Sequence, residues 1–133
     1  MRIVFDTHVL IAAFISKGAC SELFEHCARR HRLVSSDFIL GEFSRNLVKK
    51  FGISSLQASK AIRLLESRIE KVIPLSLETS ACRDSSDIHV IGTALAGQCH
   101  CLVTGDKDLL VLKKFRHVDI ISPSGFWKYE SGV

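Results

Sequence analysis

The sequence has few of the features that mark disordered, fibrous or disulfide-bonded chains. Its 133 residues include only 2 prolines and 8 glycines, and it contains no internal repeat or low-complexity tract. Hydrophobic residues make up 47% of the chain, as is typical of a packed globular domain. The 5 cysteines are an odd number without a CxxC pair or regular spacing. This pattern argues against a disulfide framework, so we expect reduced thiols and a cytoplasmic protein.

Long hydrophobic runs are also missing. No apolar stretch reaches the ~18–20 residues that a membrane-spanning helix needs, so we expect no membrane attachment. The first residues, MRIVFDTHVLIAAFIS, place an acid and a histidine in the apolar stretch and end in no small-residue cleavage site, which argues against a signal peptide. One hydrophobic core typically spans ~100–150 residues, and no linker divides the chain. We therefore expect a single domain over residues 1–133.

The net charge of +4 is unevenly distributed. Residues 1–71 contain 12 Lys and Arg against 7 Asp and Glu, whereas residues 72–133 contain 6 against 7. A basic first half favours an anionic partner such as nucleic acid, although charged surfaces are more often simply solvated. The candidate phosphate contacts are basic residues of this half: Arg29, Arg30, Arg32, Arg45, Lys49 and Lys50.

Short apolar runs alternate with longer segments of helical periodicity. The predicted strands are residues 3–5, 33–34, 72–74, 101–104 and 119–121. The predicted helices are residues 8–15, 20–31, 38–51, 54–69, 85–96 and 109–112, with a last helix starting at Ser122-Pro123. Strands separated by helices need crossover connections, so the pattern predicts an α/β fold with a mostly parallel sheet of four to five strands covered on both faces.

Acidic residues gather near one edge of this predicted sheet. Asp6 directly follows the first strand, and Asp106 follows the strand 101–104 by two residues, so both lie at the carboxyl edge. Asp87 falls in the first turn of a helix that starts near that edge, and Glu42 lies on the protein-facing side of its helix. Ligand sites of parallel sheets form beyond the carboxyl ends of the strands.

Each acid also has a structural explanation. Asp87 and Asp106 suit a helix N-terminus, and Glu42 could pair with Arg45. Four converging acids are harder to explain in this way, because clustered carboxylates repel one another unless a cation lies among them. An all-oxygen ligand set favours Mg²⁺ or Mn²⁺ over zinc.

Four short motifs carry these acids: Asp6-Thr7-His8 after an apolar strand, Glu42 within a helix, the segment DIHVIGTALA that opens with Asp87, and the segment LVTGDKDL that contains Asp106. Together they resemble the PIN-domain ribonucleases, and especially the VapC-like toxins of toxin–antitoxin pairs. The resemblance covers residues 1–124 and implies a PIN-like three-layer α/β/α sandwich.

The resemblance also implies roles for individual residues. Asp6, Glu42, Asp87 and Asp106 would bind one or two Mg²⁺ or Mn²⁺ ions, with Asp108 as an auxiliary acid. Thr104 would orient the ligands, and Asp84 matches an acid upstream of the third ligand in one subgroup. His8 is a departure, since many members carry Asn there.

The activity that the resemblance implies is endoribonuclease hydrolysis of RNA phosphodiester bonds by a toxin with an antitoxin partner and a homodimeric state. A bound cation would lower the pKa of its water and neutralise charge on the phosphate. The alternative is a catalytically silent PIN-like module that binds nucleic acid or protein.

Other motifs are weaker. Cys99-His100-Cys101 provides too few ligands for a closed zinc site, and Gly105 lacks the partner glycines of a nucleotide-binding loop. A phosphoacceptor receiver domain also gathers acids at a sheet edge, but it needs a Lys where this chain has Ser122. Phe126 and Trp127 indicate an anchor for the last helix or a dimer contact.

Overall fold

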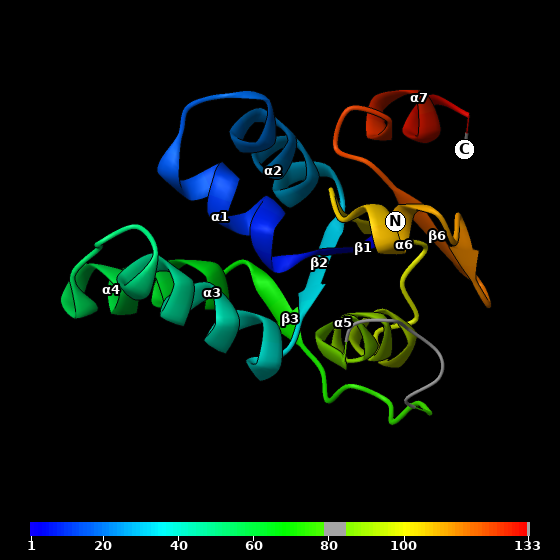
Figure 1. Ribbon diagram of the computed structural model, residues 1–133. Coiled ribbons are helices and arrows are strands. Elements are labelled where there is room, and N and C mark those ends of the chain that lie inside the picture. Colours follow the sequence, from blue (N-terminus) through cyan, green and yellow to red (C-terminus); the bar gives the residue numbers. More distant parts are fainter. Residues whose placement is uncertain (79–84, 133) are drawn as a thin grey trace.

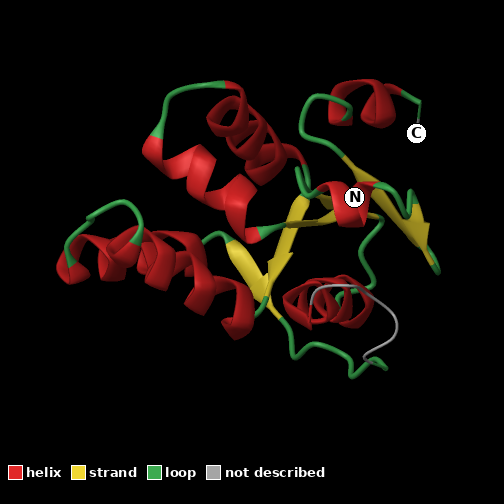
Figure 2. Ribbon diagram, in the orientation of Figure 1, coloured by secondary structure: helices red, strands yellow, loops and turns green. Residues whose placement is uncertain are grey.

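A six-stranded sheet forms the centre of the computed structural model, which describes residues 1–78 and 85–132 (Figures 1 and 2). Its strands are β1 (Arg2–Phe5), β2 (Arg32–Ser35), β3 (Ile69–Lys71), β4 (Cys101–Val103), β5 (Lys114–Phe115) and β6 (Val118–Ile121). The order across the sheet is β3-β2-β1-β4-β6-β5, and every neighbouring pair is parallel except β5 with β6.

Seven helices are present in the described residues. They are α1 (Thr7–Ile15), α2 (Ala19–Arg30), α3 (Asp37–Lys49), α4 (Ser55–Glu66), α5 (Ser85–Ala96), α6 (Lys107–Leu110) and α7 (Phe126–Ser131). Side chains cap several N-termini, as Ser36 does for α3 and Ser54 for α4. None of these helices has both the length and the apolar character needed to cross a membrane.

Two helical layers enclose the sheet. The chain moves toward the β3 edge of the sheet in its first two connections, from β1 to β2 and from β2 to β3, which contain α1 to α4. It moves toward the opposite edge in the connections that contain α5 and α6. Because crossovers between parallel strands are almost always right-handed, the two directions place their helices on opposite faces. Figure 1 shows α1 and α2 on one side of the strands and α5 on the other. The predicted α/β/α sandwich with a mostly parallel sheet is confirmed.

The central strands are buried on both faces. Ile3, Val4 and all of β4 are 0% exposed, and Leu33 and Val34 of β2 are nearly so. Near-continuous apolar runs of this kind are what a parallel strand between two helical layers requires. The short runs in the sequence therefore predicted the central strands well.

The sheet has one strand more than the four to five expected. Lys114–Phe115 pairs antiparallel with β6 through a tight turn at Arg116 and His117, and Arg116 has a positive φ of 53°. Tight hairpin turns that need positive φ usually contain Asn or Gly. Without either residue, the sequence carries no signal for this hairpin.

The third strand was predicted three residues too late. The helix predicted over 54–69 ends at Glu66, and the strand is Ile69–Lys71 rather than 72–74. Ile69 fits the apolar spacing of the helix, but in the structure it pairs with Leu33 of β2. Leu56, an apolar residue in the first turn of α4, is 63% exposed.

Two short helices are also shifted from their predicted positions. The helix predicted at 109–112 is α6 at Lys107–Leu110, capped by Asp106. The last helix begins at Phe126 because the Ser122 hydroxyl accepts a hydrogen bond from the Gly125 nitrogen (3.0 Å) and closes a turn first. Phe126 is fully buried and anchors α7.

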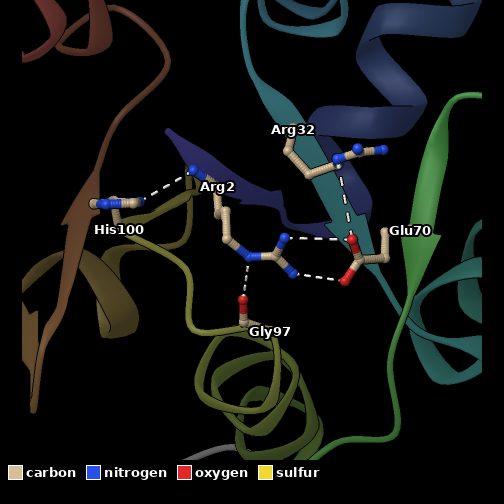
Figure 3. Close-up of polar contacts among 5 residues, drawn as sticks. All are labelled: Arg2, Arg32, Glu70, Gly97 and His100. Atoms are coloured by element: carbon tan, nitrogen blue, oxygen red, sulfur yellow. Dashed lines mark hydrogen bonds and ion pairs between the residues drawn. The ribbon is translucent and has the colours of Figure 1, made fainter.

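Arg2 joins three elements at the amino edge of the sheet (Figure 3). Its guanidinium donates to both carboxylate oxygens of Glu70 on β3 (2.6 and 3.3 Å) and to the Gly97 carbonyl after α5 (2.6 Å). Its backbone nitrogen donates to His100 Nδ1 (3.0 Å), and Arg32 lies 4.0 Å from Glu70. The hydrogen bond from Arg2 is the main reason that the pKa of Glu70 lies below its ordinary value.

This ion pair predicts an acid-dependent loss of stability. A lowered carboxyl pKa stabilises the fold above the ordinary value of 4.5, and this contribution is lost as pH falls through the folded-state pKa. Glu70→Gln should lower the free energy of unfolding at pH 7 by less than ~1 kcal/mol, because the carboxylate is half exposed. Urea unfolding at pH 7 and pH 3 should show a smaller difference in the variant than in the wild type. Equal differences in the two proteins would contradict the assignment, and Glu78→Gln, at an exposed site, is the control.

Candidate active site

The parallel pairing of β1 with β4 brings the first acid and the Thr104 segment together. Phe5 pairs with Val103, and the Asp6 nitrogen continues the ladder by donating to the Val103 carbonyl (2.9 Å). Directly beyond the strands, the Thr104 hydroxyl donates to Asp6 Oδ2 (2.7 Å) and accepts from the Asp106 nitrogen (3.0 Å). Thr104 thus joins the segments of two predicted acids, and its side chain is completely buried.

Asp6 and Asp106 are both N-caps. Asp6 Oδ1 accepts from the Thr7 nitrogen (2.7 Å) at the start of α1, and Asp106 Oδ1 accepts from the Asp108 nitrogen (2.9 Å) at the start of α6. The structure thus confirms that Asp106 caps a helix N-terminus. It uses one carboxylate oxygen, so it does not by itself exclude a ligand role for this residue.

Glu42 is held by a residue that the sequence analysis did not assign to the site. The Thr7 hydroxyl donates to Glu42 Oε1 (2.9 Å), and Thr7 is 1% exposed. This contact joins α1 to α3 and turns the Glu42 carboxylate toward the end of β1. The adjacency of Thr7 to Asp6 was the only signal in the sequence.

Asp87 lies in the first turn of α5 and is 5% exposed. Two contacts fix this helix against α3, which carries Glu42. The Thr93 hydroxyl donates to Ser36 Oγ (2.9 Å), and the His89 ring stacks on Phe38 with 4.1 Å between centroids. Asp87 is therefore a buried acid on a helix that packs against the Glu42 helix.

The electrostatics of Asp6 reflect its burial. Desolvation raises the pKa of the Asp6 carboxyl above its ordinary value, and the negative charge of Asp106 raises it further. The hydrogen bonds from Thr104 and Thr7, and the nearby His8, act in the opposite direction without cancelling the rise. A cation beside this carboxylate would remove part of that electrostatic cost.

The other predicted residues differ in their exposure and in their distance from the acids. His8 and Asp108 are exposed next to Asp6 and Asp106 in the chain, and Asp84 lies outside the described residues. Cys99 and Cys101 are core residues with 0% exposure, and this burial raises the pKa of each thiol to about 12. His100 between them accepts a hydrogen bond from the Arg2 backbone nitrogen.

The predicted basic residues fall into two groups. Arg29 and Arg30 end α2 and Arg32 begins β2, so these three lie at the amino edge of the sheet, opposite Asp6. Arg45 and Lys49 are exposed on α3, the helix of Glu42, and Lys50 directly follows its end. Only the second group shares an element with a predicted acid.

The donor chemistry of the four predicted acids fits a hard cation. All four acids offer carboxylate oxygens, the ligands that Mg²⁺ and Mn²⁺ prefer. No three of them in the described part of the chain have oxygens that all lie within 4.8 Å of one another. In the described residues these acids are therefore spaced more widely than one ion that binds three carboxylates directly requires.

Comparisons with known proteins agree with this architecture. Among solved structures, VapBC2 of Rickettsia felis bound to a promoter DNA fragment has a TM-score of 0.69 at 15% identity, covering 92% of this chain and 98% of that one. VapBC-1 of nontypeable Haemophilus influenzae has a TM-score of 0.63 at 18% identity, covering 93% and 99%. The PIN domain endonuclease Utp24 has a TM-score of 0.51 at 20% identity, covering 91% and 84%. At these identities the likeness shows the fold.

No curated protein sequence matches the chain. The family model described as PIN domain matches residues 2–108, a stretch that contains all the predicted acids. It includes β1 through β4 and the residues that follow β4, where Thr104 and Asp106 lie. The chain therefore belongs to the PIN-domain family, a family of nucleases.

Proposed function

We propose that the protein is a metal-dependent endoribonuclease that hydrolyses RNA phosphodiester bonds. Asp6, Glu42, Asp87 and Asp106 would hold Mg²⁺ or Mn²⁺, with Asp108 as an auxiliary acid. The observation that carries this proposal is the buried Asp6 carboxylate, tied through Thr104 to the Asp106 segment at the carboxyl edge of a PIN-domain sheet.

In this proposal, the hydroxyl-bearing residues set the positions of the acids. Thr104 donates to Asp6 and Thr7 donates to Glu42, so each carboxylate has one oxygen held by a buried threonine. Such contacts orient metal ligands and limit their motion. In this proposal the threonine contacts hold Asp6 and Glu42 in place, and a bound cation would draw the remaining acids closer.

A divalent cation bound by these acids supplies an activated water near neutral pH and neutralises charge on the scissile phosphate. The protein residues then have two tasks, which are holding the cation and orienting the phosphate. No protein nucleophile is needed, which agrees with the absence of a catalytic Ser or Cys motif in the sequence.

The biological role that we propose is the toxin of a toxin–antitoxin pair in the cytoplasm. The similarity of the fold to VapBC2 and VapBC-1 supports a protein antitoxin as partner. A homodimer is also proposed, with Trp127 at 44% exposure as one apolar residue available for contact.

Asp106→Asn tests the metal site without removing the helix cap, because Asn caps a helix about as well as Asp. The wild type should cleave mixed single-stranded RNA in Mn²⁺ and not in EDTA, and the variant should be inactive in both. In EDTA the free energy of unfolding of the variant should equal that of the wild type or exceed it by up to ~1 kcal/mol, because the substitution relieves repulsion between carboxylates. Added Mn²⁺ should stabilise the wild type much more than the variant.

Three outcomes would contradict the proposed metal-dependent activity. If Asp106 only caps α6, Asp106→Asn should be as stable as the wild type, and Mn²⁺ should change the stability of both proteins equally. Undiminished cleavage in EDTA would exclude the metal mechanism. A wild type that binds RNA and is stabilised by Mn²⁺ but never cleaves would indicate the silent binding module instead.

Thr104→Val tests the orienting hydroxyl. The change keeps the side-chain shape but leaves the buried Asp6 Oδ2 and the half-buried Asp106 N–H without this partner. The free energy of unfolding in EDTA should fall by ~1–3 kcal/mol, the cost of unpaired buried polar groups. Thr104→Ser, which keeps the hydroxyl, should retain most of the Mn²⁺-dependent activity that Thr104→Val loses. Equal unfolding midpoints for the wild type and Thr104→Val would show that the hydroxyl bridge contributes nothing.

The two basic groups allow a matched test of RNA binding. Arg45 is three residues from Glu42 on α3, so both occupy neighbouring positions of one helix face. We expect Arg45→Gln, Lys49→Gln and Lys50→Gln together to weaken RNA binding in EDTA and to reduce the log–log salt slope by up to ~2. The triple Gln variant of Arg29, Arg30 and Arg32 has the same charge change at the opposite edge and should bind like the wild type. A larger loss in this second variant would reverse the assignment.

A further inference from the structure

Two histidines and a glutamate converge on the side of the protein that carries α7. His26 lies on α2, His31 directly follows α2, and Glu130 lies on α7. Glu130 Oε2 is 2.7 Å from His26 Nε2 and 2.5 Å from His31 Nε2. One ligand atom from each residue lies within 4.8 Å of the other two, and in the described chain no other group of three or more His, Cys, Asp or Glu meets this condition.

The surroundings hold both rings in place. The Trp127 ring lies 4.7 Å from the His26 ring, and Phe126 packs edge-on to His31 with 6.1 Å between centroids. The side chains of His26, His31 and Glu130 are 21%, 12% and 26% exposed, so an ion from solvent can reach them. The Nδ1 atom of His31 lies 3.0 Å from the Met1 nitrogen, which fixes the ring with Nε2 toward Glu130.

We propose that His26, His31 and Glu130 form a second metal site, specific for a borderline transition metal ion such as Zn²⁺. Two imidazole nitrogens and one carboxylate oxygen are ligands that Zn²⁺ binds, and three protein ligands leave a fourth position for water. Mg²⁺ prefers an all-oxygen set, so the donor chemistry separates this site from the four acids.

The distances require only a small adjustment. At Zn–N and Zn–O bond lengths of ~2.0–2.2 Å, neighbouring ligand atoms of a tetrahedral site lie ~3.3 Å apart. The two Nε2–Oε2 distances of 2.7 and 2.5 Å are shorter than this because they are hydrogen bonds. Moving the Glu130 carboxylate by less than ~1 Å opens the space.

The site is separate from the proposed active site. His31 precedes β2 and contacts the residue before β1, so it lies at the amino edge of the parallel sheet, whereas Asp6 follows β1 at the carboxyl edge. The metal would join α7 to α2 across about 100 residues of sequence. It would stabilise the docking of the last helix rather than act on RNA.

The test is calorimetric titration of the full chain with ZnCl₂ at pH 8, because metal binding releases protons from its ligands and is favoured at higher pH. An excess of Mg²⁺ in the buffer competes with Zn²⁺ for the carboxylates of the four acids. The wild type should bind one Zn²⁺ per chain and melt at a higher temperature with Zn²⁺ than without it. Co²⁺ in place of Zn²⁺ should give the visible absorption of a nitrogen-containing site of low coordination number.

Matched variants decide the outcome. His26→Gln and Glu130→Gln should both lose the Zn²⁺ transition. His117→Ala, which removes an exposed histidine in the turn between β5 and β6, should keep it. Circular dichroism in EDTA checks that each variant is folded, and Glu130→Gln retains the hydrogen-bonding shape if His26→Gln does not fold. No saturable Zn²⁺ binding by the wild type, or unchanged stoichiometry in Glu130→Gln, would overturn the proposal. Neither readout depends on nuclease activity, so this proposal and the proposed function fail independently.

Discussion

The parallel pairing of β1 with β4 is the constraint on which the site depends. The two strands are separated by almost the whole chain, yet their register aligns Phe5 with Val103, so that the next residues, Asp6 and Thr104, meet at a hydrogen-bond distance of 2.7 Å. A shift of one residue would turn every side chain of one strand to the other face and separate this pair. The apolar residues of β1 and β4, buried on both faces, prevent such a shift. The core therefore sets the geometry of the polar edge.

The two edges of the sheet differ in how their charged side chains are paired. At the amino edge, charges are paired, as Arg2 is with Glu70, and Gly97 allows α5 to end close to β2, where an added Cβ would come within 2.6 Å of a Val34 methyl carbon. At the carboxyl edge, Asp6 is buried and has a raised pKa next to another acid. In the proposed function, a cation bound beside Asp6 would remove part of this electrostatic cost.

The sequence predicted the parts of the fold that depend on burial and missed those that depend on turns and contacts. The short apolar runs at Ile3–Phe5 and Cys101–Val103 are typical of strands in a sheet covered on both faces. They therefore predicted both strands and the residues that lie beyond their carboxyl ends. Ile69 satisfies a helical and a strand pattern equally, and only its pairing with Leu33 decides between them. The Thr7–Glu42 contact joins residues 35 positions apart, which local periodicity cannot report. The His26, His31 and Glu130 cluster was invisible for the same reason, because it forms only when α7 docks on α2.

The position of Asp6 explains why a capping residue and a candidate ligand can be the same side chain. As the N-cap of α1, it must use extended backbone geometry and point one oxygen at the first helical nitrogen. The second oxygen then faces the neighbouring strand end, where Thr104 binds it. A carboxylate held from two sides has few rotamers left, so little side-chain entropy remains to be lost when a cation binds. The same hydrogen bonds that cap the helix and join the strands therefore preorganise the carboxylate, and fold stability and site geometry rest on the same atoms.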